Sequence, residues 1–459
     1  MKKAPRLGLF EFIYGVNSLG FLDFVRQAWR RYGDAFEVKI GPQILFFVMH
    51  PDAVEHVTVT GRQGFDKLAS YDVVRKYLTG EGLVASTGDL WRRQRKLMAP
   101  FYTPKGVQAY AELMIRDGAR VVDRWEELAK RRAEVDIAEE MTFVTASIIL
   151  KAMFSTESMD SIRRTKSAVE AMLAFAETPM TGVRLPLWVP TKKNRDYLEA
   201  RDMIHRLITG LIAQRRGMEE SDWPDDLLSR LMKARDEETG RPMSDTLLRD
   251  ESITTYFAGH ETTARTMTFT WYALAANPGV ASKLHAELDR VLGGRLPTAE
   301  DLRRLPYTLQ VVKEVLRLYP AAPFYARDAI GATTIGDYEV PAGAAVMLSP
   351  YFTHRHPQFW DAPEVFDPDR WTPEREAGRH PYAYHPFAAG PRICIGNNFS
   401  LLESHLLLAM LGQRFEPRLM PGYAPKWEMR GTLGIRNGLP MILEKREATR
   451  EVSAALPAS

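Results

Sequence analysis

The stretch HPFAAGPRICIG, residues 385–396, contains Cys394, the one cysteine among the 459 residues of the chain. A free cysteine is most often a small buried hydrophobic residue, but the neighbours of this one favour another role. Gly390 is followed by a proline, which favours a tight turn, and Arg392 places a positive charge two residues before the sulfur. Gly396 lies two residues after the sulfur and has no side chain, so another group can approach closely there.

Cys394 also precedes a predicted helix. The apolar stretch NNFSLLESHLLLAML begins at Asn397 and has the pattern of a buried helix. The free N–H groups and the positive end of the dipole at a helix N-terminus stabilise a thiolate. The sequence therefore indicates a reactive thiol that serves as a nucleophile or as a metal ligand.

The composition is that of a soluble globular enzyme, with 45% hydrophobic and 26% charged residues. Lys and Arg number 61 against 58 Asp and Glu, and the net charge of +3 predicts no binding to nucleic acid. A single cysteine excludes internal disulfides, so we expect a cytoplasmic protein. The apolar N-terminal stretch LGLFEFIYGVNSLGFLDFV is interrupted by Glu11, Asn17 and Asp23, which predicts that no segment spans a membrane.

The hydrophobic pattern along the chain predicts a mainly α fold with small β-sheets. Hairpins are predicted around Gly41-Pro42 and at Asn437-Gly438. Length alone favours two or three domains, because single cores stop growing near about 250–300 residues. The helical part is expected at about 90–320 and the β-rich parts at about 35–50, 321–350 and 415–445.

The stretch around Cys394 resembles the haem-binding loop of the cytochrome P450 monooxygenases, whose pattern is F-x-x-G-x-R-x-C-x-G. The resemblance implies haem b (iron protoporphyrin IX) as cofactor, with Cys394 as the thiolate ligand of the iron, which favours O–O cleavage. It also implies that Arg392 pairs with a haem propionate and that His385 belongs to the cofactor site. The implied fold has a long central helix over the haem and the cysteine loop below it. All five fixed positions match, at Phe387, Gly390, Arg392, Cys394 and Gly396.

The family also carries E-x-x-R on a helix, which Glu314–Arg317 matches. The spacing alone is weak evidence, since it recurs at Glu287–Arg290 and Glu238–Arg241, where we expect solvated pairs worth less than about 1 kcal/mol. Only the first copy leads into FDPDRW, in which Arg370 matches the arginine that completes the family's buried cluster. Trp371 stands where the family more often has phenylalanine.

A long helix is predicted over residues 250–278, and its centre is unusual. Gly259 costs about 1 kcal/mol relative to alanine, and consecutive threonines are poor helix formers. One interpretation is close packing at the glycine, with threonine hydroxyls bonded to backbone carbonyls. The centre also resembles the family's oxygen-activation pattern A-G-x-[ED]-T, which matches at Ala258, Gly259, Glu261 and Thr262.

This second resemblance implies that Thr262 holds water beside the iron and that Glu261 resupplies its protons. Ala258 lies four residues before Thr262, so its carbonyl can accept the threonine hydroxyl, and a helix widened there would contain a π-bulge. We expect His260 and Thr263 to point away and to have no catalytic role.

Further matches extend the expected cofactor pocket. Trp91 and Arg95 match the family's W-x-x-x-R helix, and both are expected to reach a propionate. Arg327 occupies a position at which many family members carry another propionate-binding arginine. Between Trp91 and Arg95 and just after them, Arg92, Arg93 and Lys96 form either a basic docking patch or an ordinary solvated helix face.

The substrate is expected above the haem, against Ala322, Pro323 and Phe324, with parts of GTLGIRNG also facing it. Loops near residues 66–86 and 175–195 should form the pocket and its lid. Their apolar content favours an apolar substrate such as a terpenoid, steroid, fatty acid or polyketide, and no arginine in QILFFVM is placed to hold a carboxylate. The apolar side chains considered are Phe65, Tyr71, Leu173, Phe175, Leu185, Leu187 and Trp188.

The family resemblance covers nearly the whole chain and overrules the expectation of several domains. We expect one haem domain over residues 1–459, with a loose tail at 446–459, as a monomer. No flavin or nicotinamide motif remains, so a separate ferredoxin or flavodoxin and its reductase should supply electrons, with NAD(P)H acting only through them. The expected reaction inserts one atom of dioxygen into the substrate. The alternatives are a haem peroxygenase or isomerase, a non-catalytic haem sensor, and a hydrolase with Cys394 as nucleophile.

Overall fold

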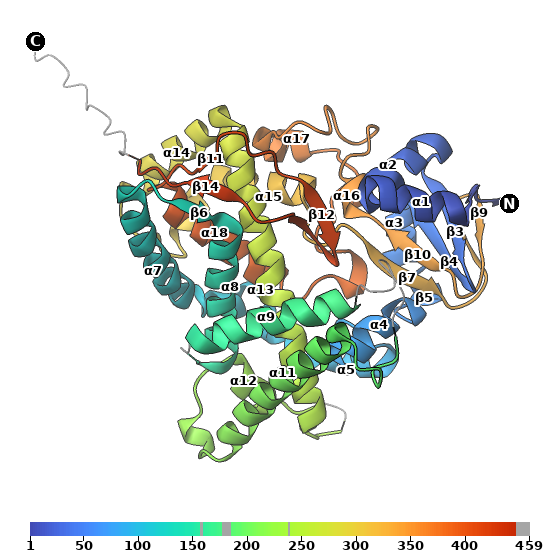
Figure 1. The fold of residues 1–459 in the computed structure, drawn as a ribbon, viewed down its shortest axis with the longest axis horizontal. Coiled ribbons are helices and arrows are strands. Elements are labelled where there is room, and N and C mark those ends of the chain that lie inside the picture. Colours follow the sequence, from blue (N-terminus) through green and yellow to red (C-terminus); the bar gives the residue numbers. More distant parts are fainter. Residues whose placement is uncertain (157–158, 177–184, 237–238, 447–459) are drawn as a thin grey trace, which may run out of the picture.

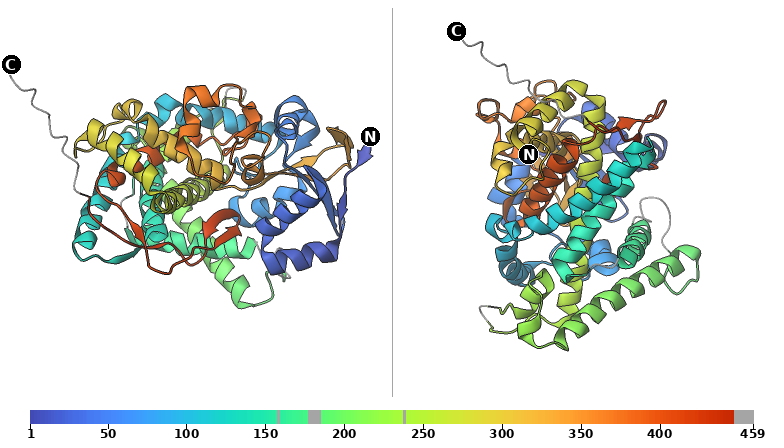
Figure 2. Two further views of the ribbon diagram at one scale, coloured as in Figure 1. Left: turned by 90° about the horizontal axis from the view of Figure 1, so that it is seen from above. Right: turned by 90° about the vertical axis from the view of Figure 1, so that its left-hand side faces the viewer.

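A computed structural model describes residues 1–156, 159–176, 185–236 and 239–446 of the chain. A helical body fills most of the molecule, and a β-rich part that includes the N-terminal strands lies at one end of its long axis (Figure 1). Figure 2 shows the same arrangement from two further sides. No described helix is both long and apolar enough to span a membrane.

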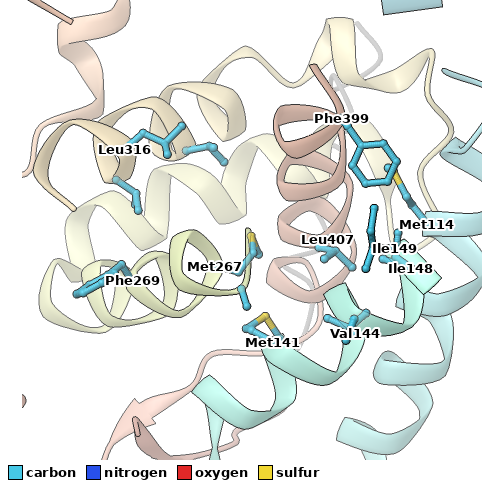
Figure 3. Close-up of a cluster of buried hydrophobic side chains, with 14 of the residues drawn as sticks. Met114, Met141, Val144, Ile148, Ile149, Met267, Phe269, Leu316, Phe399 and Leu407 are labelled. Carbon is cyan, nitrogen blue, oxygen red and sulfur yellow. The ribbon is translucent and has the colours of Figure 1, made fainter. Parts of the chain in front are cut away.

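The helical body is built around α13 (Asp245–Ala276), a helix of 32 residues that runs through its centre (Figure 1). Apolar side chains of neighbouring helices pack against it and form one continuous core, part of which is shown in Figure 3. The other long helices are α7 (Ala111–Lys130), α8 (Ile137–Phe154), α9 (Met159–Ala176), α11 (Lys192–Arg216), α14 (Pro278–Leu292), α15 (Pro306–Leu318) and α18 (Asn397–Gly412). Shorter helices are α1 (Leu9–Leu19), α2 (Phe21–Tyr32), α3 (Pro51–Glu55), α4 (Asp72–Val74), α5 (Gly88–Met98), α6 (Pro104–Gln108), α12 (Leu227–Lys233), α16 (Pro350–Thr353) and α17 (Pro373–Glu376).

The crossing of α13 with α8 depends on Gly259. A Cβ atom at Gly259 would lie 2.9 Å from the side chain of Ile149 on α8, closer than side chains tolerate. Figure 3 shows Ile149 beside its neighbours Ile148 and Val144 in this part of the core. The expectation of close packing at Gly259 is therefore confirmed.

The largest sheet joins segments that are far apart in the sequence. Its strand order is β2-β3-β4-β10-β7-β5, and the central pair β4–β10 is parallel, with Leu45 opposite Ala345. The chain thus returns after about three hundred residues to complete the N-terminal sheet. Its strands are β2 (Arg6–Leu7), β3 (Ala35–Ile40), β4 (Gln43–Val48), β5 (Phe65–Asp66), β7 (Tyr325–Ala329) and β10 (Ala345–Leu348).

One of the two predicted hairpins is confirmed and the other is wrong. β3 and β4 pair antiparallel, with Ile40 opposite Gln43 across the turn at Gly41-Pro42. Asn437 and Gly438 do form a turn, with φ of 64° and 79°, but the strands before and after it belong to different sheets. The hairpin in this region instead joins β12 (Trp427–Arg430) to β13 (Thr432–Ile435). The remaining strands are β1 (Lys2–Lys3), β6 (Glu134–Asp136), β8 (Thr333–Ile335), β9 (Tyr338–Val340), β11 (Arg418–Leu419) and β14 (Pro440–Ile442).

A buried ionic cluster ties α15 to the segment that precedes the cysteine loop. Glu314 and Arg317 are fully buried and form two hydrogen bonds of 2.8 and 2.9 Å. Arg370 lies 3.4 Å from the same carboxylate. Trp371 donates its indole N–H to Glu314 at 3.0 Å, a bond that phenylalanine could not make. The cluster therefore pairs one buried carboxylate with two guanidinium groups, whose terminal N–H groups also bind backbone carbonyls of the segment that precedes the cysteine loop.

Of the other two E-x-x-R copies, the one at Glu287–Arg290 has a different role from that expected. Glu287 is buried rather than solvated, and its carboxylate accepts hydrogen bonds from the backbone N–H groups of Tyr307 and Thr308 at 2.8 Å each. It thereby caps the N-terminus of α15. Glu238 of the remaining copy lies outside the described residues.

Replacing Arg370 by alanine should remove its ion contact with Glu314 and leave the carbonyls of Asp361 and Ala362 without their donor. We expect a loss of about 3–5 kcal/mol in the free energy of unfolding, measured by urea denaturation, and poor retention of the expected cofactor. Arg375→Ala is the matched control, because Arg375 pairs with Asp367 at the surface with 44% of its side chain exposed, and should cost less than about 1 kcal/mol. Equal urea midpoints for the two variants would contradict the assignment of Arg370 to the cluster.

Candidate active site

A cavity of about 300 Å³ lies inside the protein between α13, α5 and the cysteine loop. Its walls are mostly apolar, and four cationic side chains face it, whereas none of the described residues that line it is acidic. The apolar lining comes from Leu83, Val84, Met98, Ile149, Ala258, Leu316, Ala321, Ala322, Ile395 and Phe399. The cations are Lys67, Arg95, Arg327 and Arg392.

The cysteine loop holds the thiol of Cys394 at the cavity wall, just before α18 begins at Asn397. The backbone N–H of Cys394 donates to the carbonyl of Phe387 at 2.8 Å, which closes the loop. Gly390 has φ of 69°, and a Cβ atom there would lie 2.0 Å from the carbonyl oxygen of Thr58, so only glycine fits. The matched glycine is therefore needed for the backbone path of the loop.

The residue is exposed, and it lines the cavity. Burial raises the pKa of Cys394, while a hydrogen bond from the backbone of Gly396 and the charges of Arg95 and Lys67 act in the opposite direction. The expected position at a helix N-terminus is confirmed. A cation bound in the cavity would add to these influences and hold the residue as thiolate.

Arg392 points into the cavity edge and is held from three sides. Its guanidinium donates to the carbonyl of Ser86 at 2.8 Å and to Asp66 at 2.6 Å. It also lies over the ring of Trp91, with 3.9 Å between its central carbon and the ring centroid. Trp91 thus supports Arg392 by a cation–π contact and itself lines the cavity, so its reach to a propionate stays a prediction.

Lys67, Arg95 and Arg327 lie with Arg392 in the cavity wall, and we call these four residues the cationic edge. Arg95 donates to the carbonyl of Ile393 in the cysteine loop at 2.8 Å, and Arg327 is 4% exposed beside the cavity. Lys67 donates to the carbonyl of Val84 at 2.8 Å, and burial together with the charges of Arg327 and Arg392 holds the pKa of its ammonium well below the usual value. Sequence reasoning missed Lys67, because its neighbours form no pattern that marks a ligand.

On the opposite side, α13 presents Thr262 and Ala258 to the cavity. The hydroxyl of Thr262 donates to the carbonyl of Ala258 at 2.7 Å, as the spacing predicted. α13 is α-helical throughout its range and contains no π-bulge at this point. The hydroxyl bond to Ala258 and the packing at Gly259 fit into a regular helix, so no widening is required.

The carboxylate of Glu261 does not face the cavity. It accepts a hydrogen bond from the hydroxyl of Thr432 on β13 at 2.8 Å and lies 3.5 Å from the guanidinium of Arg265. His260 points away as expected, with its ring stacked on Tyr256, a centroid distance of 4.7 Å. Thr263 instead lines the cavity and donates to Ser400 on α18 at 3.1 Å, which corrects the expectation for that residue.

The expected substrate side is only partly present at the cavity. Ala322 lines it, but Phe324 packs into the core against Phe21, with ring centroids 5.3 Å apart, and the carbonyl of Pro323 accepts the hydroxyl of Ser349 at 2.9 Å. β7 begins directly after Phe324, and the sheet turns that side chain toward the N-terminal helices. No described residue of 431–438 lines the cavity.

The two loops predicted to form the pocket and its lid are also only partly present at the cavity. The first contributes Tyr71, Leu83 and Val84 to the cavity, whereas Phe65 packs in the β-rich core. From the second, no described residue lines the cavity, and residues 177–184 lie outside the described residues. Leu173, Phe175 and Leu187 pack in the main core, and Leu185 and Trp188 are exposed at the surface.

His385 also lies behind the cavity rather than in its wall. Its Nδ1 is 3.2 Å from the hydroxyl of Tyr325, which does line the cavity, and its backbone N–H donates to His354 at 2.8 Å. Burial lowers the pKa of His385 to about 3, so the imidazole is neutral. His385 therefore positions Tyr325 and the start of the loop.

These residues fit an iron porphyrin. A thiolate is a suitable axial ligand for haem iron, and a cationic edge with no acidic side chain in the cavity wall suits two carboxylate groups such as propionates. The apolar walls suit a flat hydrophobic ring system. Cys394, Arg95, Arg327, Arg392 and Lys67 would hold the group.

Comparisons with known proteins agree with this site. The family model described as Cytochrome P450 matches residues 4–442. Two relatives from Streptomyces melanosporofaciens are cyclooctatin synthase, 35% identical over 89% of each chain, and cyclooctat-9-en-7-ol 5-monooxygenase, 33% identical over 94% of each chain. The crystal structure of the cytochrome P450DA haem domain superposes with a TM-score of 0.89 at 28% identity and covers 98% of both chains.

The chain belongs to the cytochrome P450 family. Its fold is that of a P450 haem domain. It is an oxidoreductase that incorporates oxygen, a haem monooxygenase, and the family implies the haem cofactor.

Arg392→Ala should weaken haem retention more than Ile393→Ala, because only Arg392 offers charge to a propionate. We expect at least about a ten-fold faster transfer of haem from the arginine variant to an acceptor protein, the size expected for one charge-assisted hydrogen bond. The measurement is the rate of haem loss to apomyoglobin, followed by absorbance. Equal loss rates for the two variants would count against a propionate site at Arg392.

Proposed function

We propose that this monooxygenase hydroxylates or epoxidises an apolar, terpenoid-like substrate, using dioxygen as the second substrate. The observation that carries the proposal is the apolar cavity, whose side chains Leu83, Val84 and Ala322 offer no charge to a substrate. Two relatives support the substrate class by their names, since one is a monooxygenase of cyclooctat-9-en-7-ol. β4 carries no arginine that could hold a fatty-acid carboxylate.

Haem and the residues around the cavity have separate roles in the proposed reaction. When bound, haem supplies the activation of dioxygen and the transfer of one oxygen atom to the substrate. Cys394 would ligate its iron, and the cationic edge would hold its propionates. The hydroxyl of Thr262 donates its proton to the carbonyl of Ala258. The oxygen of Thr262 would therefore accept a hydrogen bond from a water molecule in the cavity.

Glu261 would supply protons to that water, and it must first leave Thr432 and Arg265, its present partners. This acid–alcohol pair is what favours a monooxygenase that uses dioxygen over a peroxygenase or isomerase, which needs no such proton delivery. A haem sensor would need neither the pair nor turnover.

We also propose that electrons come from a separate ferredoxin or flavodoxin that docks over α5. Arg92 and Arg93 are exposed on this helix, whose other face carries Trp91 and Arg95 to the cavity. Asp89 pairs with Arg92, so the patch is weaker than its cations alone suggest. NAD(P)H would act only through the partner's reductase.

We further propose that residues 1–459 form a single haem domain that acts as a monomer. Lining residues from Lys67 to Ser400 meet at one cavity, and one hydrophobic core runs through the helical body, which supports a single unit. The tail beyond residue 446 lies outside the described residues.

Thr262→Ala should uncouple electron use from product formation. With a surrogate ferredoxin and its reductase, and a panel of terpenoid alcohols, the wild-type protein should form a product that carries one atom of isotopically labelled dioxygen. The variant should form product about 10–100-fold more slowly and release hydrogen peroxide instead. Thr262→Ser keeps the hydroxyl and should retain most of the activity. Products formed equally well by the alanine variant, or only with added peroxide, would contradict this function.

Reversing the charge of Arg92 and Arg93 to glutamate should slow reduction by an acidic ferredoxin about ten-fold at low salt, and the difference should shrink as ionic strength rises. The same reversal at Arg30 and Arg31 on α2 is the control. Stopped-flow reduction under carbon monoxide gives the rate. Unchanged reduction of the Arg92 and Arg93 variant at low salt would refute docking at α5.

A further inference from the structure

Residues 80–86 form part of the cavity wall without belonging to any helix or strand. We call them the wall segment; it presents Leu83 and Val84 to the cavity. An irregular segment inside a protein must find partners for its backbone groups outside itself. Those partners decide how firmly this part of the wall is held.

Two carboxyl groups of α13 bind N–H groups of the wall segment. The N–H of Glu81 donates to Asp250 at 3.0 Å, and the N–H of Leu83 donates to Glu251 at 3.1 Å. The residue that contacts the cavity is therefore attached directly to the carboxyl group of Glu251.

The carbonyl groups of the wall segment accept side-chain donors, two of which also face the cavity. Lys67 donates to Val84 and Arg392 donates to Ser86, at 2.8 Å each. Gln94 on α5 donates to Glu81, and Arg75 donates to Ala85, both at 2.6 Å. The wall segment thus connects α13 to the cationic edge of the site.

Two glycines allow the wall segment to lie directly on α13. A Cβ atom at Gly82 would lie 1.9 Å from the hydroxyl of Thr254 and 2.8 Å from the carbonyl oxygen of Asp250. At Gly80, with φ of 58°, a Cβ atom would lie 2.2 Å from the carboxylate of Asp250. The contact therefore depends both on the acceptors of α13 and on the missing side chains of the segment.

Glu251 is not among the residues that line the cavity. Its side chain is 0% exposed, and its second oxygen has no hydrogen-bond partner among the described residues. Burial and the nearby charge of Asp250 raise the pKa of Glu251 to about 8, so at neutral pH it is a neutral acid that accepts the Leu83 N–H. A neutral group can remain buried beside Asp250 without charge repulsion.

We propose that Glu251 is a positioning residue that fixes the wall segment against α13 and thereby determines which apolar molecules fit the cavity. The inference rests on the proposed function, because it assumes that the cavity beside the haem receives the substrate. Removing the acceptor should loosen Leu83 and Val84 and weaken the binding of bulky apolar ligands, while the attachment of haem through Cys394 stays intact.

The test uses the full-length haem-loaded protein and two azole probes that reach the iron through the cavity. Imidazole is small and reports iron access alone, whereas 4-phenylimidazole adds an apolar ring that must pack against the wall. Glu251→Ala should raise the Kd of 4-phenylimidazole about ten-fold, the size of one lost hydrogen bond, and change that of imidazole less than about two-fold. Amide exchange in residues 80–86 should accelerate about ten-fold.

Three variants complete the design. Glu251→Gln keeps a carbonyl oxygen for the Leu83 N–H and should restore both readouts. Gly82→Ala leaves Glu251 intact but forces the segment off α13, and should reproduce the alanine phenotype. Glu287→Ala is the control, because it removes a buried carboxylate that also binds backbone N–H groups but lies outside the cavity lining. It should change neither the ratio of the two azole Kd values nor amide exchange in residues 80–86.

The outcomes separate the two levels of the account. If the ratio of the Kd of 4-phenylimidazole to that of imidazole is unchanged in Glu251→Ala, the positioning role is overturned. Loss of haem in both Glu251→Ala and Gly82→Ala also overturns it, because Glu251 would then serve the fold as a whole. If the wild-type protein contains no haem or binds neither azole, the proposed function fails instead.

Discussion

As the proposed ligand of haem iron, the thiol of Cys394 must ionise inside a mostly apolar cavity, and much of the structure around it meets this requirement. Burial raises the pKa of the thiol, so ionisation needs positive potential from its surroundings. The N-terminus of α18, the N–H of Gly396, and the charges of Arg95 and Lys67 supply it. The same cations form the edge that suits the carboxylates of haem. One electrostatic arrangement would therefore serve both the sulfur of Cys394, as the proposed ligand atom, and the propionates of haem.

The scaffold keeps two distant parts of the chain in register across the cavity. On one side, the Glu314–Arg317–Arg370 cluster holds the segment that leads to the cysteine loop, and Trp371 adds a hydrogen bond to its carboxylate. On the other side, α13 crosses α8 at Gly259 and places Thr262 opposite. The wall segment connects the two sides through Glu251 and Arg392. The cavity is thus a product of tertiary contacts rather than of any single element.

The sequence predicted those parts of the site whose geometry is set locally. The loop around Cys394, the pair Glu314–Arg317 and the bond from Thr262 to Ala258 depend on short spacings along one turn or one helix face, and the structure shows each of them. Directions of side chains set by packing could not be predicted in this way. Phe324 belongs to an aromatic core that includes residues some three hundred positions earlier, and Glu261 is turned by Thr432 of a hairpin near the other end of the chain.

Residues without a motif were missed for a related reason. Lys67 and Glu251 are ordinary charged residues in the sequence, and only the fold shows that both are buried and bonded to the same irregular segment. Asn437-Gly438 had the right turn geometry, but the turn connects two sheets because the preceding strand pairs backward with β12. The sequence shows the residue type or the turn at each of these positions, whereas the side chain or strand that contacts it is set by the fold.

The most direct test of the central claim is the absorption difference spectrum of the purified, reduced protein with and without carbon monoxide. Ligation of haem by the thiolate of Cys394 predicts a strongly red-shifted Soret band. Haem without this shift would mean that Cys394 is protonated or displaced, and no haem at all would favour a cysteine nucleophile; either result would contradict the site described here.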